Sequence, residues 1–150
     1  MSPNRMFHIA IALVAALLLA GCDGHDHAHE EPGHAHEAGQ ATALQLNDGQ
    51  RWAMDDHTRE SMHQLDAILS EEAPATPEGY RRMGERLHET TRELIAGCTM
   101  QGPAHDQLHI YLGELLPRIA TLRETDDAAA GESILAELRT GQDRFHHYFQ

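Results

Sequence analysis

Apolar positions divide the chain into three stretches of different character. Residues 9–20 form an unbroken apolar run, and residues 23–43 contain no Leu, Ile, Val or aromatic side chain. From residue 54 onward, apolar side chains recur at spacings of three and four. Such spacing is typical of amphipathic α-helices, which bury one face. The pattern therefore predicts a leader, a flexible tether and a helical domain.

The first two predicted helices have clear start signals. The first begins near Asp55 or Asp56, either of which could cap it, and it ends in the sequence EEAPATPEG. The second begins after Thr76, because threonine caps helices and Pro77 suits the first helical position. Their apolar lines are Met54, Thr58, Met62, Leu65, Ile68 and Leu69, and then Tyr80, Met83, Leu87, Thr91, Leu94 and Cys98.

Two more helices follow the break at Gly102 and Pro103. The third contains Pro117, which should kink it or shorten it locally, and the fourth runs from about Ala128 to Tyr148. Their apolar lines are Leu108, Tyr111, Leu112, Leu115, Leu116, Ile119 and Leu122, and then Ile134, Leu135, Leu138, Phe145, Tyr148 and Phe149. Four amphipathic segments with short breaks predict an all-α domain over residues 44–150, an antiparallel up-down four-helix bundle. We expect Trp52 to pack over its end.

The first 22 residues have the three parts of a secretion signal: Arg5 in a short polar start, the apolar run, and small residues before Cys22. The run of about 12 residues is shorter than the ~20 that a membrane-spanning helix needs, so residues 1–21 are predicted to be removed. Residues 19–22, LAGC, resemble the lipobox of bacterial lipoproteins. The resemblance implies a palmitate-type lipid on Cys22 and a periplasmic location on the inner or outer membrane. An ordinary signal peptide with an unmodified cysteine is the alternative.

Composition narrows the class of partner. The chain has no lysine, and its 11 basic residues face 24 acidic ones, for a formal net charge of −13. Such a protein is a poor ligand for nucleic acid or for an anionic bilayer surface, whereas cations suit it. Once Cys22 is lipidated, Cys98 is the one thiol left, so no internal disulfide is expected.

The tether over residues 22–43 carries the strongest chemical signal. Its imidazoles are interleaved with Asp and Glu, and neutral imidazole is the commonest protein ligand for zinc, copper and nickel ions. The predicted ligands are His25, His27, His29, His34 and His36. Because a flexible segment must be ordered on binding, we expect modest affinity that follows the general preference for copper. The alternative is a solvated spacer.

A second candidate metal site surrounds the predicted turn between the second and third helices. Cys98, Met100, His105 and His109 offer a thiolate, a thioether and two imidazoles, a set that suits Cu(I). The alternative is that these are ordinary core and turn residues. A cysteine on an apolar line is normally inert and no oxyanion-hole loop is visible, so no enzymatic activity is predicted.

Two Glu-x-x-His pairs raise the possibility of a buried di-metal site like that of the carboxylate-bridged di-iron bundles. The helical phase opposes it, since these residues point away from the apolar lines and are expected to be exposed. They are Glu60 with His63 and Glu85 with His88, accompanied by Glu114 and Glu137 on the other helices. A c-type haem would need Cys-x-x-Cys-His, which the sequence lacks.

Two segments resemble known proteins. Residues 44–52, LQLNDGQRW, followed by Asp55, Arg59 and Met62, resemble the start of small periplasmic lipoproteins, some of them labelled DnrO-like. Residues 98–112, with the pattern CTMxGxAHxxLHxxL, resemble a motif of similar bundle proteins. Together they cover about a quarter of the chain. The resemblance implies a helical bundle in the cell envelope and gives no activity.

These features predict a membrane-tethered, extracytoplasmic metal-binding lipoprotein, held by its lipid anchor. It would collect zinc, copper or nickel ions on the histidine tether, as a buffer or chaperone, and pass them to the bundle or to a transporter or efflux protein. The alternative is a non-enzymatic interaction module in which the bundle docks on an envelope partner.

Overall fold

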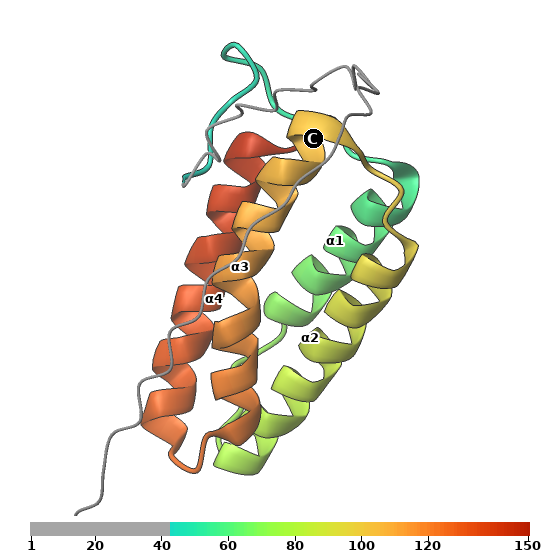
Figure 1. Cartoon of the computed structure of the whole chain (residues 1–150). Helices are drawn as coiled ribbons and strands as arrows, with labels where there is room; N and C mark the ends of the chain where they lie inside the picture. Colours follow the sequence, from blue (N-terminus) through green and yellow to red (C-terminus); the bar gives the residue numbers. More distant parts are fainter. Residues whose placement is uncertain (1–42) are drawn as a thin grey trace, which may run out of the picture. The chain divides into compact units, whose positions relative to one another are not determined.

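The computed structural model describes residues 43–150. These residues form four α-helices: α1 (Asp56–Leu69), α2 (Pro77–Gly97), α3 (Gly102–Glu124) and α4 (Ala128–Tyr148). Successive helices run in opposite directions, and α4 packs against both α3 and α1 (Figure 1). The predicted all-α, up-down four-helix bundle is therefore confirmed. None of these four helices is long and apolar enough to cross a membrane.

Three of the four helices begin at a side-chain cap. Asp55, Thr76 and Asp127 each accept a hydrogen bond from the backbone N–H three residues further on, which satisfies one of the N–H groups left free at a helix start. The start of α3 has no such bond; Gly102, with φ of +66°, and Pro103 turn the chain into the helix. Glycine adopts this left-handed conformation without strain. The predicted helix starts are thus confirmed, with Asp55 as the cap of α1.

The core is a continuous apolar cluster contributed by all four helices. Tyr111 and Phe145 lie with ring centroids 4.7 Å apart, and Phe145 stacks on Phe149 at 4.6 Å. Burial raises the pKa of Tyr111 far above its usual range, so its hydroxyl stays protonated and donates to Gln142 Oε1 at 2.7 Å. The buried apolar residues are Met62, Leu65, Ile68, Leu69, Tyr80, Met83, Leu87, Leu94, Leu108, Tyr111, Leu112, Leu115, Ile119, Leu122, Leu135, Leu138, Phe145 and Phe149.

Pro117 does not shorten α3, contrary to one of the two effects expected of it. The whole of α3 is 23 residues long, and Pro117 lies inside it. Pro117 is exposed, so solvent can reach the carbonyl of Gly113 that the missing N–H leaves without its helical partner. Nearby side chains reinforce the turn, since Arg118 donates to the carbonyl of Glu114 and Thr121 donates to that of Pro117.

The connection between α1 and α2 is tied to the bundle by two arginines. Arg139 on α4 donates from Nε to the Leu69 carbonyl at 2.8 Å and from Nη2 to the Glu71 carbonyl at 2.7 Å. Arg86 on α2 makes a bidentate pair with the carboxylate of Glu71. Because the last carbonyls of a helix have no partner within it, Arg139 serves as a cap supplied from another helix.

The segment before α1 closes one end of the bundle together with the last residues of the chain. The Trp52 N–H donates to the Tyr148 carbonyl at 2.7 Å, and the Gln150 N–H donates to the Trp52 carbonyl at 2.9 Å. The indole Nε1 of Trp52 donates to the Gln45 carbonyl at 2.6 Å. Trp52 is half-buried against the core, which confirms that it packs over the end of the bundle.

Candidate metal site at the start of α3

Six of the predicted site residues lie outside the described part of the chain. They are Cys22 and the tether residues His25, His27, His29, His34 and His36. Lipidation of the cysteine and metal binding by the tether histidines therefore stay predictions. The four residues of the second candidate site lie within the bundle.

A single carboxylate joins the start of α1 to the turn between α2 and α3. Asp55 Oδ1 accepts from the Thr58 N–H at 2.7 Å, and its Oδ2 accepts from the Thr99 N–H at 2.6 Å and from the Thr99 hydroxyl at 2.7 Å. Desolvation raises the pKa of Asp55, but the hydrogen bonds from Thr58 and Thr99 more than offset this and hold the pKa well below its usual 3.8. The carboxylate thus stays charged and fixes the position of the turn.

His57 reinforces the same junction from α1. Its Nε2 lies 3.0 Å from the Glu93 carbonyl in the last turn of α2. A Cβ at Gly97 would overlap the imidazole ring, so the glycine is what allows the ring to lie against α2. His57 therefore has a structural role that the sequence pattern did not indicate.

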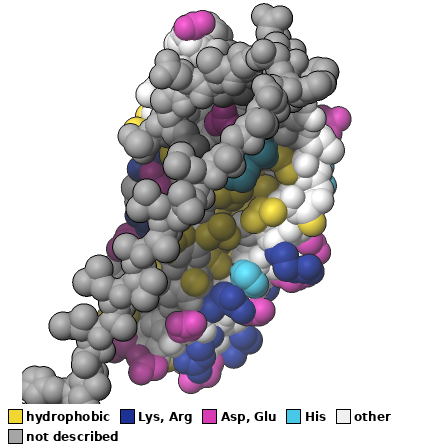
Figure 2. Space-filling model, viewed as in Figure 1, with side chains coloured by type: hydrophobic (Ala, Val, Ile, Leu, Met, Phe, Trp, Pro, Cys, Tyr) yellow, Lys and Arg dark blue, Asp and Glu magenta, His cyan; other side chains and the backbone are white. Residues whose placement is uncertain are grey.

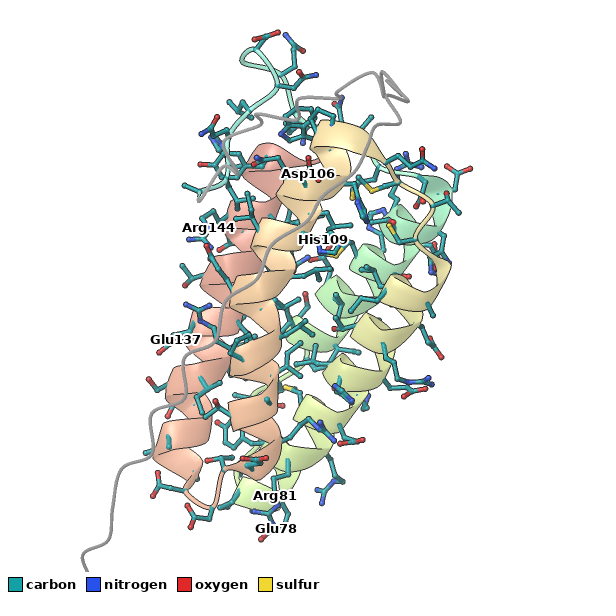
Figure 3. The ribbon with its side chains drawn as sticks, in the orientation of Figure 1. Glu78, Arg81, Asp106, His109, Glu137 and Arg144 are labelled. Carbon is teal, nitrogen blue, oxygen red and sulfur yellow. The ribbon has the colours of Figure 1, made fainter. Side chains whose placement is uncertain are left out.

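The structure brings two of the four predicted bundle ligands together. His105 and His109 lie one turn apart on α3, with their Nε2 atoms 3.1 Å apart and their ring centroids 4.4 Å apart in a T-shaped arrangement. His109 is exposed and His105 is half-buried, so solvent reaches the pair. Figure 3 labels His109 together with Asp106 on the first turns of α3.

The inward side of the same helical turns is firmly packed. Gln107 is 5% exposed and Leu108 is 1% exposed. Gln107 Oε1 accepts from the backbone N–H of Gln45 at 2.7 Å, which ties α3 to the segment that leads into the bundle. The histidine pair is therefore carried by a firmly packed turn, and among the described residues His109 is exposed on the outer face of α3.

Cys98 and Met100 occupy a different environment. Both are half-buried and pack against the apolar core, and Cys98 carries a free thiol. Figure 3 shows sulfur atoms beside the turn between α2 and α3. No three His, Cys, Asp or Glu side chains of residues 43–150 are grouped closely enough to hold a metal ion, so Cys98 does not join both histidines in such a group. Its surroundings are typical of a structural cysteine.

The Glu-x-x-His residues lie on the outside of the bundle, as their helical phase predicts. Glu60, His63, Glu85 and Glu137 are exposed, and His88 and Glu114 are half-buried. Three of the glutamates pair with arginines on neighbouring helices: Glu85 with Arg123, Glu137 with Arg118, and Glu114 with Arg144. Figure 3 places Glu137 and Arg144 on the outer side of α4. These carboxylates therefore balance surface arginines, and acidic and basic side chains lie next to one another on the face shown in Figure 2.

Two surface cavities lie elsewhere on the described bundle. One of about 400 Å³ lies between α3 and α4, where the paired Glu114 and Arg144 line it beside Tyr111. The other, of about 460 Å³, lies between α1 and α4 and contains Asp66 and His146, which are 3.0 Å apart. Neither cavity is lined by the α3 histidine pair.

Comparison of the chain with protein-family models, with curated proteins and with solved structures finds no match. The function is therefore argued from the residues and their geometry.

Proposed function

We propose that the chain is a membrane-tethered, extracytoplasmic lipoprotein that binds zinc, copper or nickel ions on its histidine tether, as a buffer or chaperone. The observation that carries the proposal is the tether itself, with five histidines between residues 25 and 36 in a segment without large apolar side chains. Solvated spacers are usually built from Ser, Gly, Pro, Gln and charged residues. A histidine at nearly every second position indicates a ligand.

The charge of the protein and the predicted position of the lipid anchor support the same function. A net charge of −13 raises the local concentration of cations around the chain. A lipid on Cys22 would hold the adjacent histidines at the membrane surface, where transporters deliver or expel ions. At ~5–6 Å × √n, about 20 tether residues would give an average reach of roughly 25 Å.

Titration of the mature chain tests the proposal. Cys22→Ser gives a soluble form, and a matched variant replaces all five tether histidines by alanine. We expect the intact tether to bind more Cu²⁺, Zn²⁺ or Ni²⁺ per chain than the alanine variant, measured by calorimetry in a non-coordinating buffer. Because imidazole binds metal in its neutral form, binding should fall below about pH 6. Equal stoichiometry in both forms would rule out the tether as a site.

The alternative proposal is an interaction module that docks on an envelope protein. The cavity of about 400 Å³ between α3 and α4 is the feature that favours it. Its walls carry the two ion pairs Glu114–Arg144 and Glu137–Arg118, which a charged partner surface could displace. In this case, substitutions at Ala136 or Gly141 that fill the cavity would abolish partner capture and leave metal binding unchanged.

A further inference from the structure

The α3 histidine pair has the geometry of a two-point metal chelate. Residues four apart on a helix lie one above the other on one face, which places both rings on the exposed side of α3. With Nε2 atoms 3.1 Å apart and metal–nitrogen bonds of 2.0–2.1 Å, the angle at a shared ion would be about 98°. This angle lies between the square-planar and the tetrahedral values. The separation of the two Nε2 atoms therefore suits a single shared ion.

The contact between the two rings is also easily replaced by a metal. Two neutral imidazoles can share a hydrogen bond between their Nε2 atoms only if one of them carries its proton on Nε2. When an ion binds both Nε2 atoms, that proton leaves and Nδ1 of the same ring takes one from solvent. The tautomer changes, and the net number of protons on the pair does not.

We propose that His105 and His109 form a bidentate clip for a divalent transition-metal ion, with Cu²⁺ bound most tightly, and that this clip does not include Cys98. It is the bundle's own receiving site for ions collected on the tether, so the inference rests in this part on the proposed function. Two imidazoles suit divalent copper, nickel and zinc, whereas a Cu(I) site would call for the soft sulfur ligands.

The residues around the clip determine its affinity for the metal ion. The remaining coordination positions face solvent, because His109 is exposed and no third His, Cys, Asp or Glu of the described bundle completes the group. The positive end of the α3 dipole lies close by and weakens cation binding. Both effects give a weak and quickly exchanging site, as a point of transfer requires, rather than a storage site.

The tested proteins are four forms of the mature Cys22→Ser chain: unchanged, with the five tether histidines replaced by alanine, with His105→Ala and His109→Ala, and with both sets. Each is titrated with Cu²⁺, Ni²⁺ and Zn²⁺ separately. We expect the tether-alanine form to keep one weak Cu²⁺ site, and the combined form to bind Cu²⁺ at least tenfold more weakly. Chemical-shift changes of His105 and His109 on adding Zn²⁺ to the tether-alanine form locate the ion directly.

A matched control removes two other imidazoles from the bundle. His63→Ala with His88→Ala in the tether-alanine background should leave the weak Cu²⁺ site unchanged. These two histidines lie on different helices, α1 and α2, whereas His105 and His109 are in contact on α3. His105→Gln with His109→Gln provides a second pair of variants, checked for helix content by circular dichroism. Loss of the site in the glutamine form as well supports the clip.

The outcomes separate the clip from the tether. If the tether-alanine and combined forms bind Cu²⁺ equally, the clip is wrong and the function of the tether is untouched. If the intact and tether-alanine forms bind equally and the combined form has lost binding, the clip stands and the tether proposal is wrong. If Cys98→Ser also loses the weak Cu²⁺ site, the claim that the clip does not include Cys98 is wrong.

Discussion

Asp55 shows how much one side chain can fix at the end of this bundle. Its two carboxylate oxygens hold the first turn of α1 and the backbone and hydroxyl of Thr99 in the α2–α3 turn. Hydrogen bonds to the ionised form favour it, which is why the pKa of this carboxyl is depressed in the folded protein. The residue therefore links protonation to the stability of the end of the bundle that carries the histidine pair.

Asp55→Ala should lower the free energy of unfolding by about 1–2 kcal/mol near pH 7, because it removes a helix cap and the bonds to Thr99. Since the folded pKa lies below the ordinary 3.8, the stabilisation is fully present above that value and is lost as the pH falls through the folded pKa. Urea unfolding of wild type and variant between pH 7 and pH 2 measures this. The difference between them should shrink below about pH 4.

Asp56→Ala is the control for this measurement. The Asp56 side chain is fully exposed and pairs with Arg59 within the same helix, a contact of little worth in water. We expect a change within about 0.5 kcal/mol. A loss of stability equal to that of Asp55→Ala, or a pH-independent effect of Asp55→Ala, would contradict the assigned role.

Single residues also mark the limit of prediction from sequence. The histidine pair was predictable because its spacing of four on a helix fixes the geometry within one element. The contact of His57 with Glu93, and the need for Gly97 beside it, join positions 36 residues or more apart, and no local pattern carries that information. Cys98 lay on a predicted apolar line, yet it ends half-buried just after α2, where the line leaves the core.

At the scale of elements, the helix boundaries were predictable because capping and breaking are local chemistry. Thr76 with Pro77, and Gly102 with Pro103, stand where the structure begins α2 and α3. The effect of Pro117 depends on whether solvent or protein lies beside the freed carbonyl, which only the folded bundle decides. The shortening expected at Pro117 was wrong for that reason.

Arg139 lies on α4 but stabilises the C-terminal end of α1, so its removal should make that end of α1 less stable. It supplies partners for the carbonyls of Leu69 and Glu71 at the end of that helix. Arg139→Ala should lower the free energy of unfolding by about 1–2 kcal/mol, because two hydrogen bonds from a charged group to backbone carbonyls are lost. Faster amide hydrogen exchange confined to α1 and the following loop is the specific signature.

Arg82 provides the comparison, since it is an exposed arginine on α2 for which the structure gives no ion pair. Arg82→Ala should leave exchange in α1 unchanged and alter stability by less than about 0.5 kcal/mol. Equal exchange in the two variants would show that the contacts of Arg139 do not hold the helix end.

At the scale of the whole molecule, the first described residues and the histidine pair lie at the same end of the bundle. Gln45, near the first described residue, bonds to Gln107, which lies between His105 and His109 on α3. The backbone hydrogen bonds of Trp52 with Tyr148 and Gln150 lie at that end as well. If the preceding segment carries a lipid anchor, this end is the one joined most directly to the membrane.

The anchor itself gives the last prediction. Lipid is attached to a bacterial lipoprotein through the thiol of the cysteine that becomes its first residue, so Cys22→Ser should abolish labelling by radioactive palmitate. The chain offers its own control, because Cys98 is the one other cysteine. Cys98→Ser should keep the label. Label that persists in Cys22→Ser, or disappears in Cys98→Ser, would mean that the LAGC pattern is not the anchor, and the histidines after it would lose their argued place at the membrane surface.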